Sequence, residues 1–481
     1  MKHTALLLFV TTSVASADSE ADTTAAVDPP RPTGEPVLVE PKPATPGPRP
    51  DKASGVAEDD EVPTGQRLLW IPRSILFLPK MAFWVAVQPA RGVAWASEHY
   101  DLAARIEDAT WTDDRRFGLY PVAGYESTYG FTIGARAVAQ DLFGEGERLK
   151  LRANWGGEFR YAVGGKVSTG TRLGRVELSN DTSYERRGRE RFYGIGDGPE
   201  LDAPAAMPID PSIDNQSIKS RFSEDLFRDK LVIKTGIVGA LSSRLSGAYV
   251  ERKFDTSDKD PIETRYEIDK LAGFSDGVKN IYVEHELAYD TRRPASPYAT
   301  QTTDGAGWWI SAHAGVARGI DGDPTRYFRY GGEVQHYIDL YEGTRILTLR
   351  ALVDAVGGTD GRTDGRIAFV ELPTLGGSDD LRGYPSGRFR DRSIALATAE
   401  YSWQLSNHFT GYTFFDVGGP LATLEDVTPS TLRFGYGGGL QLHSKNTFYA
   451  RTQLAVSREG EFFFSLIFSP AYGRRERVGR F

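Results

Sequence analysis

The chain has 481 residues, contains no cysteine and carries a formal net charge of −8. The missing cysteines exclude disulfides, cysteine-based metal sites and a lipid attached at a cleavage-site cysteine. Mean hydropathy is −0.39, and no run of about 18 uncharged apolar residues follows the first residues, so we expect no transmembrane helix. The 52 glycines, 22 tyrosines and 25 phenylalanines indicate strands joined by turns. A soluble β protein and a membrane barrel, which is apolar only at alternate positions, both fit this composition.

The N-terminal quarter divides into three segments. Residues 1–17 predict a secretory signal peptide, because a basic start and an apolar stretch precede the small residues Ala15-Ser16-Ala17. Residues 18–65, rich in Pro, Ala, Thr, Asp and Glu, predict a disordered periplasmic linker. Residues 66–115 are apolar but interrupted by prolines, which predicts short amphipathic helices. These helices would lie at the membrane interface or pack on the end of the next domain, and the residues leave both open.

Residues 116–470 predict an all-β fold, a transmembrane antiparallel barrel. Alternating segments are separated by Gly, Asp, Pro and Ser clusters. A tilted membrane strand needs roughly 9 to 11 residues, so the region accommodates about 16 strands, an even number as bacterial barrels have. We expect the long connections 196–217 and 290–307 to be extracellular and the tight turn at 143–147 to be periplasmic. A basic tail, residues 471–481, follows the last strand.

A charged, glycine-rich loop interrupts the alternation near the C-terminus. It contains Leu381-Arg382-Gly383-Tyr384, and its glycines let it fold tightly. Alternation places Glu400 and Asp416 on the polar, inward face of the next two strands. A guanidinium that reaches into the barrel would find bidentate partners in these carboxylates. The alternative is a solvated loop whose charges face water.

Three segments resemble motifs of the BamA/TamA superfamily of outer-membrane barrels, also called the bacterial surface antigen family. Residues 381–384 resemble its [VIL]RG[FY] loop motif, residues 414–418 its FxDxG strand motif, and residues 141–146 its NLFGxG-type periplasmic turn, with Asp in place of Asn. The resemblance covers roughly residues 116–470 and implies a long loop folded into the lumen, with Asp416 accepting from Arg382. Family members usually carry periplasmic POTRA domains, so this chain resembles the subgroup without them.

The resemblance implies insertion, assembly or translocation of polypeptides, with lipids as an alternative substrate, at the outer membrane of a Gram-negative bacterium. The internal loop would gate a seam between the first and last strands. The loop-lock residues, which would hold this loop in the lumen, are Arg382, Gly383 and Tyr384 of the loop with Asp416 and Glu400 of the wall, and the seam residues are Tyr120, Tyr125, Phe462, Phe464, Leu466 and Phe468. A passive pore is the alternative. Expected partners are outer-membrane lipids, lipopolysaccharide and unfolded outer-membrane proteins, and we expect a monomer that binds no nucleic acid.

We expect no enzymatic activity, cofactor or metal site. His285 lies between Glu284 and Glu286, but no nucleophile motif accompanies it. The Asp-Gly repeats at 321–323 and 360–365 lack the spaced carboxylates of a calcium loop and predict turns.

Overall fold

The computed structural model describes residues 109–477, with gaps at 127–129, 157–159, 197–218, 294–304, 359–366, 407–408, 422–430, 444–447 and 468–470. The predicted signal peptide 1–17, the linker 18–65 and most of segment 66–115 therefore lie outside the described residues. So do Phe468, the loop 197–218 and the end of the tail.

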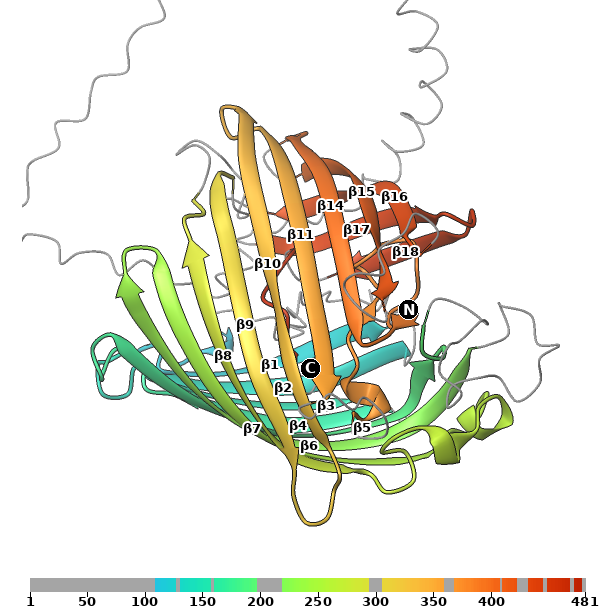
Figure 1. Cartoon of the computed structure of the whole chain (residues 1–481). Coiled ribbons are helices and arrows are strands. Elements are labelled where there is room, and N and C mark those ends of the chain that lie inside the picture. The colour runs from blue at the N-terminus through green and yellow to red at the C-terminus, as the bar shows by residue number, and fades with distance from the viewer. Residues whose placement is uncertain are drawn as a thin grey trace, which may run out of the picture. The chain divides into compact units, whose positions relative to one another are not determined.

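Sixteen antiparallel strands form one curled sheet, in which each strand pairs with its neighbours in chain order (Figure 1). The predicted all-β fold and the strand number are confirmed. The strands are β1 (Phe117–Glu126), β2 (Gly130–Gln140), β3 (Arg148–Trp155), β4 (Arg160–Ser168), β5 (Val176–Phe192), β6 (Ser220–Val238), β7 (Leu241–Thr256), β8 (Val278–Asp290), β9 (Gly307–Gly319), β10 (Arg326–Tyr341), β11 (Arg345–Gly358), β14 (Ser393–Gln404), β15 (Phe409–Leu421), β16 (Arg433–His443), β17 (Phe448–Ser457) and β18 (Phe462–Ile467).

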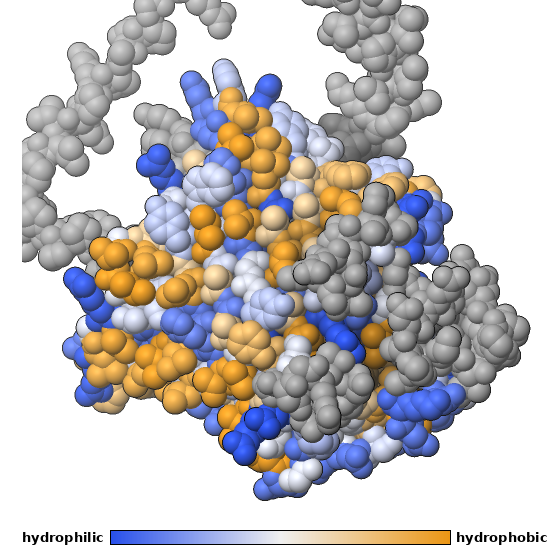
Figure 2. Space-filling view, viewed as in Figure 1, coloured by the Kyte–Doolittle hydropathy of each residue, from blue (hydrophilic) through white to orange (hydrophobic). Residues whose placement is uncertain are grey.

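The two faces of the sheet differ in polarity because successive side chains of a strand point to opposite faces. On β14, Thr398 and Glu400 are buried, whereas Ala397 and Ala399, which alternate with them, are exposed. The same rule leaves large apolar side chains on the outer face of many strands, where they gather in patches (Figure 2). A soluble barrel would bury the apolar face instead. The structure therefore has the lipid-facing pattern of a membrane barrel.

Strand order also determines which connections lie at the same end of the sheet. Six strands separate the turn at 141–147, between β2 and β3, from the connection between β8 and β9. Because six is even, these two connections lie at the same end. The β5–β6 connection lies at the opposite end. The expectation that 196–217 and 290–307 are both extracellular is therefore wrong, since length and polarity do not determine the end of a barrel.

The segment between β11 and β14 folds over the inner face of the sheet. It contains the 3-10 turn η5 (Phe369–Glu371) and a small hairpin of β12 (Thr374–Leu375) and β13 (Phe389–Arg390). Phe369 packs among Phe192, Phe222 and Tyr266 in an apolar cluster. Tyr266 comes from the β7–β8 connection, which holds η3 (Ile262–Thr264) and η4 (Ile268–Lys270). This apolar packing fixes the base of the loop at the end of the barrel opposite the 141–147 turn.

No helix within the described part of the chain is long and apolar enough to cross a membrane.

The lipid-facing assignment predicts a depth-dependent cost for charge on the outer face. Val283, at the middle of β8, and Tyr289, near its end, are both exposed. We expect Val283→Arg to lower the free energy of unfolding by about 2–4 kcal/mol, because the charge would lie near the bilayer centre, and Tyr289→Arg by about 0–1 kcal/mol. Urea titration of the protein folded into vesicles measures both. Equal losses at the two positions would contradict the assignment.

Candidate functional site

The loop turns sharply at residues 381–383, inside the sheet. Leu381 has a φ of 55° and Gly383 a φ of 100°, conformations that glycine adopts far more readily than other residues. A Cβ atom on Gly383 would lie only 3.0 Å from the backbone carbonyl of Val456 on β17. Gly383 is thus required both by its backbone angle and by the close approach of the loop to the wall.

Arg382 is completely buried and has carboxylate partners on two strands. Its Nε and one terminal nitrogen donate to the two oxygens of Asp416, each at 2.8 Å, and its backbone N–H donates to the same carboxylate at 2.9 Å. The other terminal nitrogen donates to Glu400. The guanidinium lies 3.6 Å from the centre of the Phe414 ring. The loop arginine is therefore held by a bidentate ion pair, a second ion pair and a cation–π contact.

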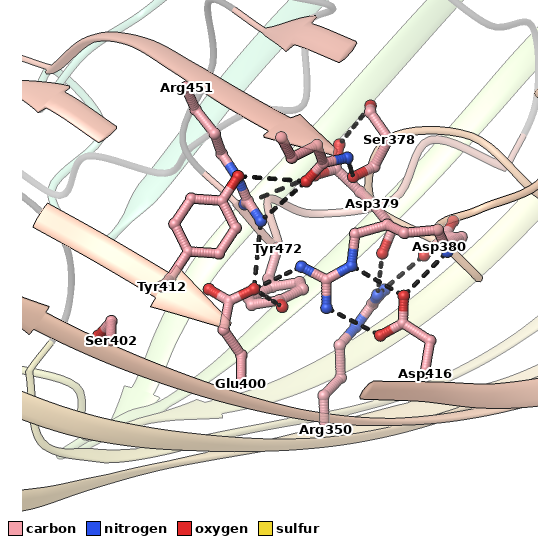
Figure 3. A network of polar contacts seen from close by, with 12 residues as sticks. Arg350, Ser378, Asp379, Asp380, Glu400, Ser402, Tyr412, Asp416, Arg451 and Tyr472 are labelled. Atoms are coloured by element: carbon pink, nitrogen blue, oxygen red, sulfur yellow. Dashed lines mark hydrogen bonds and ion pairs between the residues drawn. The ribbon is translucent and has the colours of Figure 1, made fainter. Parts of the chain in front are cut away.

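Glu400 is shared by three donors, as the labelled side chains around it in Figure 3 illustrate. Besides Arg382, its Oε2 accepts from Arg451 of β17 at 3.2 Å and from the hydroxyl of Tyr472 at 2.6 Å. Arg451 in turn donates to the hydroxyl of Tyr412 at 2.9 Å. Two carboxylates and two guanidinium groups thus form one buried network, whose members need one another because each buried charge requires a partner.

β16 leaves room for the loop because its inward positions beside Asp416 and Phe414 are glycines. Gly435 lies beside Asp416 in the strand register, and a Cβ atom on Gly435 would be 1.7 Å from the carbonyl oxygen of Arg382. The next inward glycine, Gly437, lies beside Phe414, and its Cβ would be 2.9 Å from that ring. Side chains at these positions would displace the arginine and the ring beneath it.

The charges around Arg382 offset the cost of burying it. Burial alone would lower the pKa of the Arg382 guanidinium, but the facing Tyr472, Asp416 and Glu400 raise it well above its ordinary value. The Arg382 guanidinium therefore stays charged although it is buried.

Tyr384 connects the loop to the turn before the last strand. Its hydroxyl donates to Glu459 at 2.8 Å, in the β17–β18 turn, and its ring lies in an apolar cluster with Leu381 and Phe389. Leu352 of β11 and Leu396 of β14 belong to the same cluster. Apolar packing on one side and ion pairs on the other therefore fix the Leu381–Tyr384 segment.

The structure brings all five predicted loop-lock residues together. Asp416 and Glu400 both face inward and both contact Arg382, while Gly383 and Tyr384 position the turn. Sequence reasoning did not find Tyr472, because nothing in the basic tail indicates that it returns to the lumen.

The predicted seam residues lie on the two terminal strands of the sheet order. Tyr120 and Tyr125 belong to β1, although the side chain of Tyr125 is outside the described part. Phe462, Phe464 and Leu466 lie on β18 and are exposed on the outer face. Phe468 lies outside the described residues.

His285 points away from its two carboxylate neighbours. It is exposed on the outer face of β8 and pairs with the hydroxyl of Ser243 at 2.8 Å, whereas Glu284 and Glu286 are buried on the inner face. Alternation along the strand separates the imidazole from both acids. Among the described residues, no group of three or more His, Asp or Glu side chains could hold a metal ion.

A sixteen-stranded sheet with an apolar outer face and an internal loop held by a buried arginine defines a class of outer-membrane barrels. Residues 141–457 match the Omp85 superfamily domain, and the chain belongs to this superfamily. The predicted relationship to BamA-type barrels is thereby confirmed.

Two solved structures illustrate the likeness. BamA from Haemophilus ducreyi lacking POTRA domains 1–3 is 15% identical, with a TM-score of 0.52 over 73% of this chain and 69% of that one. CdiB from Escherichia coli is 14% identical, with a TM-score of 0.46, and the match covers 73% of this chain and 61% of CdiB, less than two thirds of its length. The BamA likeness shows the fold. No curated protein matches the sequence.

The ion pair between Arg382 and Asp416 predicts strong coupling between the two side chains. Arg382→Ala should lower the free energy of unfolding by about 3–5 kcal/mol, because it leaves a buried carboxylate without its cation. Asp416→Ala should have a similar effect. In a double-mutant cycle measured by urea unfolding in vesicles, we expect a coupling energy of about 1–3 kcal/mol. Strictly additive losses would contradict direct pairing.

The close approach at Gly435 predicts that one methyl group is enough to displace the loop. Gly435→Ala should lower the free energy of unfolding by about 1–3 kcal/mol and increase protease cleavage within residues 376–388, because its Cβ overlaps the Arg382 carbonyl oxygen. Gly247→Ala on β7 is the matched control, since a Cβ there meets nothing within 4 Å. The same cleavage rate in both variants would refute this account of β16.

Proposed function

We propose that this barrel inserts or translocates polypeptides at the outer membrane of a Gram-negative bacterium, through a seam between β1 and β18. In this proposal the segment 367–392 is a luminal lock that holds the seam shut. The chain reaches the membrane by export through the N-terminal signal peptide. Its partners are outer-membrane lipids, lipopolysaccharide and unfolded outer-membrane proteins, and it acts as a monomer without enzymatic chemistry.

The position of the loop anchors carries the proposal. Arg382 contacts β14 and β15, and Gly383 lies against β17. Tyr384 donates a hydrogen bond to the turn between β17 and β18. All of these elements lie among the last five strands of the sheet order, which ends at β18. A loop anchored in this way restrains the strands that must move when the seam opens.

The last strand supports a weak seam. β18 has 6 residues, the fewest among the sixteen described wall strands, whereas β1 has 10. A short strand offers few backbone hydrogen bonds to a partner, so separating it costs less than separating two long strands. Once separated, the β1 edge presents unpaired N–H and C=O groups, which template an incoming client strand by β-augmentation.

Lipids are the alternative substrate, because a seam that admits a strand also disturbs the bilayer beside it.

A passive pore is the second candidate function. In a pore, the inward charges Glu400, Asp416, Arg433 and Arg451 would tune ion selectivity. The buried ion-pair network argues against this candidate, since buried guanidinium groups that are paired with carboxylates present little free charge to a passing ion.

Depletion of the protein from its host separates these candidates. We expect specific outer-membrane barrels to fall in abundance while total lipid composition stays constant, measured by quantitative proteomics and lipid analysis of purified outer membranes. Re-expression of the wild-type chain should restore the barrels, and Arg382→Ala should restore them incompletely. Altered lipid asymmetry with unchanged barrels would favour lipid handling. Unchanged proteins and lipids, together with lost conductance, would favour the pore.

Covalent closure of the seam tests the route. The chain has no cysteine, so a cysteine at Leu119 on β1 can be paired in turn with one at Phe462, Phe464 or Leu466 on β18. A crosslinked pair should abolish restoration of the client barrels, and reduction of a cleavable crosslink should recover it. Each single-cysteine variant treated with the same reagent is the control. Full activity in the crosslinked protein would contradict a seam route.

A further inference from the structure

The described part of the C-terminal tail, residues 471–477, lies against the polar inner face of the sheet. Tyr472 is buried, and the four residues Arg474 to Arg477 are all at least partly buried. Each of these four charged side chains has an oppositely charged partner on the wall or on the loop. A basic segment that merely trailed from the last strand would instead be solvated, so the lumen contains a site that fits it.

An acidic pair on β8 holds the two outer arginines of this segment. Arg477 donates to both oxygens of Glu284, at 2.8 and 2.7 Å, and Arg474 donates from Nε to Glu286 at 2.8 Å. Both glutamates are buried and lie two residues apart on one face of the strand. Two such carboxylates repel each other and require cations nearby. Arg474 and Arg477 of the tail supply these cations.

A basic pair on β6 holds the acidic residue between these arginines. Glu476 forms an ion pair with Lys230 and lies 3.9 Å from Arg228. Burial alone would raise the pKa of Glu476, but Lys230 and Arg228 lower it well below its ordinary range. The order of charges along the tail is thus matched by opposite charges on two different strands. The wall therefore matches the order of positive and negative side chains along the tail, and not only the net positive charge of the tail.

β10 contacts the backbone of the tail at both ends of the segment. Gln335 donates from its side-chain amide to the carbonyl oxygen of Tyr472 at 3.2 Å, and Arg329 donates to the carbonyl oxygen of Arg477 at 2.6 Å. Backbone carbonyls spaced five residues apart along one segment exist only in a polypeptide. The wall therefore has groups that recognise a peptide chain as well as its charges.

We propose that the inner faces of β6, β8 and β10 form a binding site for a short arginine-rich peptide, which the chain's own tail occupies in cis. The site is composed of Lys230, Glu284, Glu286, Arg329 and Gln335. Its ligand class is a short peptide with arginines on either side of a glutamate, as in Arg474-Arg475-Glu476-Arg477.

Occupancy of this site is linked to the loop. Tyr472 donates to Glu400 at 2.6 Å, and Arg475 lies 3.4 Å from Asp380 and donates to the carbonyl oxygen of Thr374. The tail therefore bridges the β8 wall and the Arg382 network. Binding at this site requires neither a seam nor a client protein, because only residues of the lumen hold the tail.

Peptide binding to a full-length variant tests the site. Arg474→Gln combined with Arg477→Gln should vacate it, and a labelled synthetic peptide of residues 471–481 should then bind saturably in fluorescence polarisation. Adding Glu284→Gln and Glu286→Gln to that variant should weaken binding about thirtyfold, since each lost partner leaves a buried charge unpaired. Lys253→Gln with Lys270→Gln, which removes two exposed cations, is the matched control and should not vacate the site. Equal binding of a peptide with the same residues in shuffled order would overturn the proposal.

A second measurement uses the wild-type chain and decides the matter if the variants fail to fold. Trypsin cleaves after arginine, so the folded tail should be protected. An excess of the free 471–481 peptide, isotopically labelled so that its own tryptic fragments differ in mass from those of the chain, should displace the tail. Cleavage of the chain after Arg474 in a brief digestion should then increase about tenfold, measured by mass spectrometry, whereas the shuffled peptide should not increase it. Rapid cleavage without any peptide, or no increase with it, would show that the tail does not occupy an exchangeable site.

Discussion

The interior of this barrel is organised by one buried guanidinium. Arg382 has no access to solvent, so its charge and its N–H groups need partners inside the protein. These come from two different strands, Asp416 on β15 and Glu400 on β14. A point charge would satisfy one of them, whereas the planar fork of arginine satisfies both and also lies on the Phe414 ring. The rest of the site accommodates this demand. Gly383 brings the loop close to β17, and Gly435 clears the space beneath it.

The same network links three parts of the chain that are far apart in sequence. The loop contributes Arg382, the wall contributes Glu400 and Arg451, and the tail contributes Tyr472. Because Glu400 accepts from all three donors, a change in any one alters the charge balance felt by the others. The loop anchors lie near the last strands, while the tail reaches across to Glu284 on β8. The lumen is thus filled by two polypeptide segments that share one carboxylate.

Period-2 alternation made the wall of the barrel and the inward carboxylates predictable. It placed Glu400 and Asp416 on the same side as the loop, and the motif around Arg382 indicated the partner. The end of the barrel at which 290–307 lies was not predictable from length and polarity, because it depends on counting every strand before it. The tail was missed for another reason. Residues 471–477 have no periodicity, and their position depends on Lys230, Glu284 and Glu286, which lie about 190 to 250 residues earlier and are brought together only by strand pairing.

The central claim is that Arg382 restrains the strands beside the seam. Spin labels at Leu119 on β1 and Phe464 on β18, both exposed on the outer face, report the separation of the two strands by pulsed electron paramagnetic resonance in vesicles. The account predicts a single narrow distance distribution for the otherwise wild-type protein and a broader one, extending to longer distances, when Arg382→Ala is added. Identical distributions in the two proteins, with both still folded, would contradict it.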